Sequence, residues 1–151
     1  MPNWRDELIE AVKTKVERDA EEAAKQKQRV LEALASAEAA VSLATEGLRF
    51  ACERIKEKGK PAHIEESADP EGRPQSARLS LESLALALEL DRATAIVKVA
   101  YLEGKPREFD FARDRHIAAA DVEEYVGRRA VELVRSAQKA QPWRRGTERD
   151  E

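Results

Sequence analysis

The stretch that decides the fold is residues 30–55, VLEALASAEAAVSLATEGLRFACERI. Large apolar side chains recur in it every seven residues, and smaller ones recur at the same interval with an offset of three. Such a repeat keeps one face of a helix against a partner along its whole length. The eight residues of this repeat, called the seam below, are Val30, Leu34, Ala37, Val41, Ala44, Leu48, Ala51 and Ile55.

The helix that carries the seam is predicted to run from Asn3 to about residue 58. Asn3 is a good N-cap, and the acidic residues that follow it suit the positive end of a helix. Gly59 and Pro61 form a stop signal. We therefore assign residues 1–58 to one long helix with a coiled-coil-like seam, which weakens before Val30.

The predicted helix is longer than the rest of the chain can cover. About 54 helical residues span roughly 80 Å, whereas a body of about 75 residues is only about 30 Å across. The helix must pair with another copy, fold back as a hairpin or project as a stalk, and we favour pairing. The seam could instead cover the chain's own sheet and C-terminal helix, but its length argues against that as a full account.

Residues 59–78 are polar and contain Pro61, Pro70, Gly72 and Pro74, a composition that indicates a loop or linker. Residues 79–140 are predicted to form an antiparallel sheet followed by a helix, and residues 141–151 a charged tail. The predicted class is α+β, with all elements in one domain of ordinary size.

Three segments with alternating apolar residues predict the sheet: Leu84–Leu90, Ala95–Tyr101 and Glu108–Phe111. They suggest a three-stranded antiparallel meander, or a four-stranded one if Leu79–Leu81 adds a short strand. The phase of the alternation slips at Glu82-Ser83, where we expect a bulge or break. Residues 80–93 are also good helix formers, so a helix is the alternative there.

The alternation also predicts a register, because residues that share the buried face must lie opposite one another. Leu84 is then opposite Tyr101, and Leu88 is opposite Val97. In the next hairpin Phe109 is expected opposite Tyr101.

The second helix is predicted to begin at Asp121, which forms a capping-box-like pair with Glu124, and to end before Pro142. Its apolar face comprises Val122, Tyr125, Val126, Ala130, Leu133, Val134 and Ala137.

Composition and charge argue against several classes of partner. The net charge is −3, and residues 1–60 carry 12 basic and 12 acidic side chains. No region has the one-signed field typical of proteins that bind nucleic acid or anionic membranes, so we expect neither partner. A single cysteine, the lack of a signal-peptide pattern and the lack of a 20-residue apolar run lead us to expect a cytoplasmic protein.

The residues that could carry chemistry are few. His116 lies near Asp110, Asp114 and Arg115, but a solvated connection is the better interpretation of this cluster. His63 sits among acids in the polar segment, and Cys52 has no histidine nearby. There is no glycine-rich phosphate loop and no pair of cysteines for zinc, so we predict no cofactor, no metal and no catalytic residue.

The second face of the predicted sheet is small and partly apolar, which suits a dimer surface or the floor of a ligand or peptide groove. Its residues are Ala85, Ala87, Ile96, Ala100 and Leu102, interrupted by Glu89 and Lys98.

The function we expect is that of a non-enzymatic interaction or oligomerisation module that forms homodimers through the seam, with a further protein partner of unknown identity. The alternative is a small-molecule-binding domain or small enzyme. Its pocket would lie between the sheet and the helices, with Asp114, Arg115 and His116 at the rim.

Overall fold

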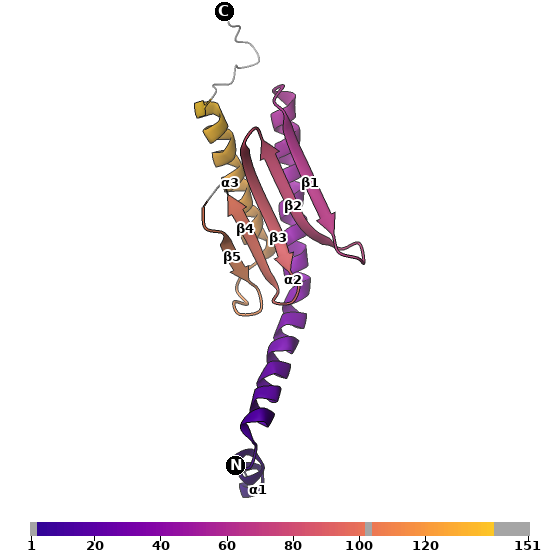
Figure 1. Ribbon diagram of the computed structural model, residues 1–151, viewed down its shortest axis with the longest axis vertical. Coiled ribbons are helices and arrows are strands. Elements are labelled where there is room, and N and C mark those ends of the chain that lie inside the picture. Colours follow the sequence, from indigo (N-terminus) through magenta and orange to yellow (C-terminus); the bar gives the residue numbers. More distant parts are fainter. Residues whose placement is uncertain (1–2, 102–103, 141–151) are drawn as a thin grey trace, which may run out of the picture.

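A computed structural model describes residues 3–101 and 104–140 and shows an α+β chain in two layers, an antiparallel sheet with two helices on one face (Figure 1). The class agrees with the prediction, but the sheet has five strands rather than three or four. Within these residues, no helix combines the length and the apolar character needed to cross a membrane. The elements in chain order are α1 (Trp4–Ala11), α2 (Lys15–Glu57), β1 (Ala62–Ala68), β2 (Pro74–Leu81), β3 (Leu84–Asp91), β4 (Ile96–Tyr101), β5 (Arg107–Asp110) and α3 (Ala119–Ala140).

The N-terminal helix is not continuous, which corrects the prediction for residues 3–58. Asn3 caps α1, but α2 has its own cap at Thr14, whose hydroxyl accepts a hydrogen bond from the Glu17 N–H at 3.2 Å. A threonine side chain that satisfies a free N–H starts a new helix at little cost, so the chain breaks at residues 12–14. The end of α2 is as predicted, with Gly59 at a φ of +75° and its N–H donating to the Lys56 carbonyl at 2.8 Å.

Residues 59–78, predicted as a loop, contain β1 and most of β2. The prolines and glycine there make a hairpin turn instead of a linker. In the turn Asp69-Pro70-Glu71-Gly72, the Gly72 N–H donates to the Asp69 carbonyl at 2.9 Å, and Gly72 has a φ of +82°. These two strands extend the predicted meander, and the sheet order is β1-β2-β3-β4-β5.

The slip in alternation at Glu82-Ser83 marks a tight hairpin between β2 and β3. Leu81 pairs with Leu84, and Glu82 takes a positive φ of 58° to close the two-residue loop. The short strand considered at Leu79–Leu81 is therefore the end of an eight-residue strand.

The predicted register of β3 and β4 is wrong by two residues, although the buried face is right. Leu86, not Leu84, lies opposite Tyr101. The turn begins later than expected because the Asp91 carboxylate accepts a hydrogen bond from the Ala93 N–H at 3.0 Å and closes the loop there. On β5, Phe109 lies opposite Val97 and not Tyr101, again an even shift that keeps it on the buried face.

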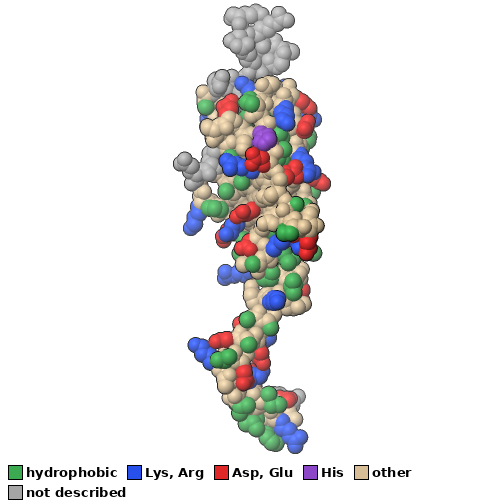
Figure 2. Space-filling model, turned by 45° about the vertical axis from the view of Figure 1, so that its right-hand side comes forward, with side chains coloured by type: hydrophobic (Ala, Val, Ile, Leu, Met, Phe, Trp, Pro, Cys, Tyr) green, Lys and Arg blue, Asp and Glu red, His purple; other side chains and the backbone are tan. Residues whose placement is uncertain are grey.

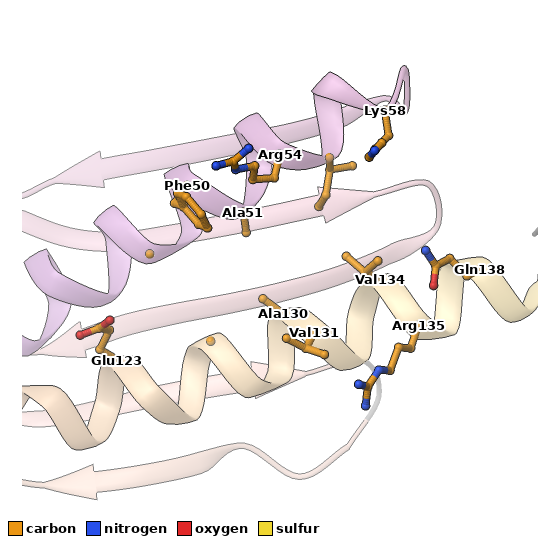
Figure 3. A pocket seen from close by; sticks show the side chains of 13 residues that line it. Phe50, Ala51, Arg54, Lys58, Glu123, Ala130, Val131, Val134, Arg135 and Gln138 are labelled. Atoms are coloured by element: carbon orange, nitrogen blue, oxygen red, sulfur yellow. The ribbon is translucent and has the colours of Figure 1, made fainter. Parts of the chain in front are cut away.

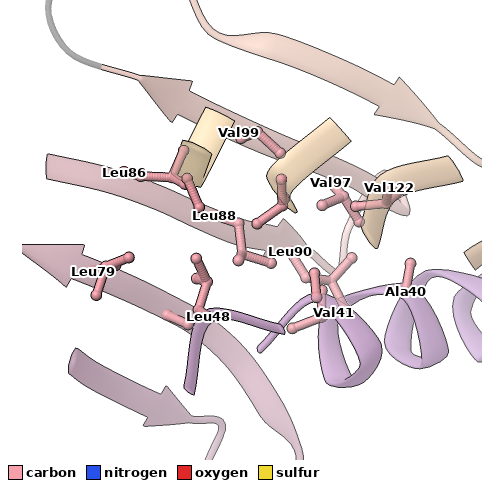
Figure 4. Packing of buried hydrophobic residues seen from close by; sticks show 14 of the residues in the cluster. Ala40, Val41, Leu48, Leu79, Leu86, Leu88, Leu90, Val97, Val99 and Val122 are labelled. Carbon is pink, nitrogen blue, oxygen red and sulfur yellow. The ribbon is translucent and has the colours of Figure 1, made fainter. Parts of the chain in front are cut away.

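The two long helices run parallel and cover the same face of the sheet, α2 over β1 and β2 and α3 mainly over β3 (Figure 1). Leucines and valines from the strands interdigitate with both helices to form one core (Figure 4). The apolar face of α3 is confirmed. Its helix begins two residues before the predicted cap, where the Asp121 carboxylate accepts a hydrogen bond from the Ala118 N–H at 2.8 Å.

The seam belongs to this core. Six of its residues, Val30, Ala37, Val41, Ala44, Leu48 and Ile55, are buried by the chain's own sheet and α3, and Leu34 and Ala51 are half-buried against the same core. The seven-residue spacing is thus used within one chain. Most of the seam is therefore covered within one chain, and Leu34 and Ala51 keep part of their surface; assembly of two copies through the seam stays a prediction.

The remaining part of α2 projects from the body. Every residue from 15 to 29 is exposed, and α1 lies at the far end of this stalk (Figure 1). Of the three arrangements considered for the long helix, the structure shows the stalk, but only for about 15 residues, roughly 22 Å. The charged tail predicted at residues 141–151 lies outside the described residues.

Candidate functional site

A groove lies between α2 and α3, on the side of the helices that faces away from the sheet (Figure 3). Its volume is about 680 Å³. It is lined by Gly47, Phe50, Ala51, Arg54, Ile55 and Lys58 from α2 and by Glu123, Gly127, Ala130, Val131, Val134, Arg135 and Gln138 from α3.

The groove exists because small residues face one another where the helices meet. A Cβ added to Gly127 would have no atom within 4 Å, and one added to Gly47 would meet only the Glu123 side chain, at 3.9 Å. The two glycines and the neighbouring alanines therefore leave a channel open to solvent.

Two large apolar side chains stand exposed beside the channel, although neither is needed for the core. Phe50 is 63% exposed and Val131 is 48% exposed. They extend the apolar surface of the floor, where Ile55 is buried and Val134 half-buried. The groove and these two side chains together form one continuous exposed apolar surface.

Positive charge gathers at one end of the groove. Lys58, Arg135 and Arg54 lie toward the C-terminal ends of the parallel helices, whose carbonyl dipoles favour cations there (Figure 3). Arg54 is engaged by Glu57 at 3.2 Å and by the Phe50 ring at 5.2 Å. Lys58 and Arg135 have no ion-pair partner within the described chain, so they are available to an acidic group of a ligand.

A second apolar surface lies at the opposite end of the molecule. α1 has no buried residue, and its large apolar side chains Trp4, Leu8 and Ile9, together with Val12 after it, are between 53% and 67% exposed. Figure 2 shows hydrophobic side chains gathered at this N-terminal end. The body of the chain does nothing to cover them.

The predicted cluster around His116 lines a separate depression of about 1020 Å³ at the connection from β5 to α3. Its walls come from edge strand β5 and from α3, with Asp114, Arg115 and His116 among the lining residues, as the alternative prediction placed them. The Asp114 carboxylate accepts a hydrogen bond from the His116 backbone N–H at 2.9 Å, and Asp110 accepts one from the Arg113 N–H at 3.0 Å. These carboxylates hold the turn in shape, which matches the interpretation of a solvated connection.

The other candidate residues are separate from one another. His63 is on β1, beside Glu65 at 3.5 Å, and Cys52 is buried in α2. In the part of the chain that the structure describes, no three His, Cys, Asp or Glu residues are placed to share a metal ion.

The sheet's open face is crossed by a row of polar cross-strand pairs. The hydroxyls of Ser67 and Ser76 are hydrogen-bonded to each other. Glu89 lies opposite Lys98, and the Lys98 ammonium is 3.9 Å from the Glu108 carboxylate. The small residues predicted for this face are half-buried between such groups, except for Leu102, which is outside the described residues. This face is less continuous as an apolar surface than the groove.

A cluster of ion pairs at the β1–β2 turn has a structural explanation. Asp69 binds Arg73 at 2.8 Å and Arg92 at 3.2 Å, and both arginines also contact Glu38 of α2. Burial alone would raise the pKa of Asp69, but hydrogen bonds from the Arg73 backbone and guanidinium and the nearby positive charges outweigh it and lower the pKa. The cluster fixes two hairpin turns to α2.

No family model, curated protein or solved structure matches this chain. The site is therefore argued from its own geometry.

Sequence reasoning missed the groove and the separate identity of α1. The signals for the groove were Phe50, a large apolar residue outside the seam, and Gly127 in the middle of a helix. Glycine costs a helix about 1 kcal/mol relative to alanine, and the structure shows that Gly127 lies where no side chain packs against the helix.

Proposed function

We propose that the protein is a non-enzymatic protein-interaction module whose α2–α3 groove binds an amphipathic helix of a partner. The observation that carries this proposal is the apolar channel between the two helices, with Phe50 and Val131 exposed beside it.

Two parallel helices side by side leave a furrow into which a third helix packs with normal interaxial distances of about 8–10 Å. Such helix-in-groove recognition relies on apolar anchors at helical spacing, with charged residues at the edges that fix orientation. The groove supplies both parts, an apolar floor and a cationic end. The charged residues that line the groove can pair with charged groups of a bound helix. Among the described lining residues, no nucleophile is paired with a base.

A second candidate is a small amphiphilic anion, because about 680 Å³ lies within the range of ligand sites and the cations stand at one end of an apolar floor. The openness of the channel along its length favours the helix, which would cover more of it than a small ligand would.

Site-specific photocrosslinking tests the proposal. A benzophenone amino acid replaces Val131 at the groove in one variant and Arg78 on the open sheet face in another, and each full-length protein is irradiated in its native cell. We expect Val131, and not Arg78, to yield a crosslinked species of discrete mass.

Gly127→Glu should abolish that species, because its side chain fills the channel, whereas Gly127→Ala should retain it. Absence of any crosslink at Val131 contradicts a protein-binding groove. Stabilisation by a long-chain fatty acid that is lost in Gly127→Glu would then select the small-ligand alternative.

A further inference from the structure

Resting on that proposed function, we infer that the helix bound in the α2–α3 groove is α1 of a second copy of this chain. The molecule would then carry, at its two ends, a groove and the segment that fills it.

The α1 segment cannot reach the groove of its own chain. Residues 12–14, which link α1 to α2, span about 10 Å at most. Gly47, where the groove begins, is 32 residues beyond Lys15 along a continuous helix, a distance of roughly 48 Å. Figure 1 shows α1 at the end of the stalk, far from the upper half of α2. Docking must therefore occur between molecules.

The shape of α1 matches the groove. At 100° per residue, Trp4, Leu8 and Val12 fall in a stripe about 80° wide, with Arg5 and Ile9 along one edge, Glu7 along the other edge, and Asp6 and Glu10 on the opposite side of the helix. The eight residues of α1 extend about 12 Å, and the groove from Gly47 to Lys58 extends about 17 Å. One apolar side of α1 thus has the length and form of an insert for the channel.

The charges are complementary as well. α1 carries Arg5 against Asp6, Glu7 and Glu10, a net charge of −2. Glu10 is already held by Lys13 at 2.8 Å, which leaves Glu7, at the edge of the apolar stripe, to meet the cations at the end of the groove. In the groove those cations are Lys58 and Arg135.

A reciprocal exchange, in which each copy donates α1 to the other, satisfies both surfaces of both molecules and closes as a two-fold dimer. An eight-residue helix in a short groove buries little area compared with standard interfaces of about 1,600 Å². We therefore expect a weak dimer that forms at tens of micromolar, and not an obligate one.

Analytical ultracentrifugation of the full chain tests the inference, with Leu8→Asp, Gly127→Glu and, on the open face of the sheet, the control Arg78→Glu. Leu8 is exposed in α1, so its substitution leaves the body folded, and circular dichroism and thermal unfolding verify this for each variant. We expect Leu8→Asp and Gly127→Glu each to weaken dimerisation at least tenfold, their combination to weaken it little further, and Arg78→Glu to dimerise like the wild type.

A charge exchange gives an independent readout. Glu7→Lys and Arg135→Glu should each weaken the dimer, and the double variant should recover most of the loss if the two side chains meet. A chain that stays monomeric at 200 µM, or a dimer that Leu8→Asp and Gly127→Glu leave intact, overturns the inference. If Val131 nonetheless crosslinks to a different protein, the groove keeps its proposed function and only the identity of its occupant is refuted.

Discussion

Leu48 and Leu31 offer a direct test of how the seam is used, because the same substitution can be made at a buried and an exposed position of one helix. Leu48 is 1% exposed and packs among the strands in the core, whereas Leu31 is 55% exposed (Figure 4). Leu48→Ala removes buried methyl groups and leaves a cavity, which costs about 3 kcal/mol in well-packed cores. Leu31→Ala should change the free energy of unfolding by less than about 0.5 kcal/mol.

The loss at Leu48 is large relative to the stability of a domain of this size, which is typically about 5–15 kcal/mol. It should lower the melting temperature by roughly 6–12 °C, and urea unfolding should give a lower midpoint with an unchanged slope. Because the seam is filled by the same chain, the difference between Leu48→Ala and wild type should be the same at 5 and 100 µM protein.

A seam shared between two copies would behave differently. Its unfolding midpoint would rise with protein concentration, and Leu48→Ala would weaken association rather than the isolated monomer. A loss below about 1 kcal/mol at Leu48, or a loss seen only where the wild type is dimeric, would refute the assignment of these residues to the monomer core.

Two further predictions concern the turns and the groove. Asp69 has a lowered pKa in the folded chain, so it stabilises the protein above the ordinary aspartate pKa of about 3.9 and this contribution is lost as the pH falls through its folded value. Asp69→Asn should therefore reduce stability at pH 7 and flatten its dependence on pH below about 4 in acid unfolding, whereas Asp19→Asn on the exposed stalk should do neither. Gly59→Ala should destabilise by about 1 kcal/mol because Gly59 has a φ of +75°, and Gly127→Ala should stabilise by about 0.5–1 kcal/mol because its helical site has open space. Thermal unfolding of the two variants measures both changes in stability. Higher stability of Gly59→Ala, or lower stability of Gly127→Ala, would contradict this explanation from backbone conformation.

The parts of the fold that could be predicted were those in which one face is strongly apolar. The alternation in β3 and β4 and the apolar stripe of α3 follow directly from burial against a single core. The predicted register differs from the observed one by an even number of residues, because alternation determines only which face a residue occupies. The pairing itself is determined by the turn that Asp91 closes. An unbroken alternation, as in β3 and β4, does not indicate where their hairpin closes, whereas the slip at Glu82-Ser83 did mark the β2–β3 hairpin.

β1 escaped prediction for a related reason. It is an edge strand, and only Ala62 and Ile64 of its inward-facing residues contribute to the core; the rest of the strand is exposed. A polar edge protects a sheet from pairing with other chains, but it also removes the apolar alternation by which strands are found. The turn Asp69-Pro70-Glu71-Gly72 was the available signal, since aspartate, proline and glycine at these positions favour a hairpin over a linker.

The N-terminal helical region is longer than the body that covers it, as its length predicted. The body covers α2 only from Val30 onward, so the stalk and α1 are left in solvent as the argument required. A stalk needs only charge and helix propensity, and residues 17–29 meet that need with few large apolar side chains.

α1 does not follow this pattern. An eight-residue helix is marginal alone in water, and exposing Trp4, Leu8 and Ile9 gives it no stability. Their burial at roughly 1.5–3 kcal/mol each would be enough to stabilise α1 only when it is docked. The stalk therefore places an apolar segment beyond the reach of its own body, which is why we infer that a second copy receives it.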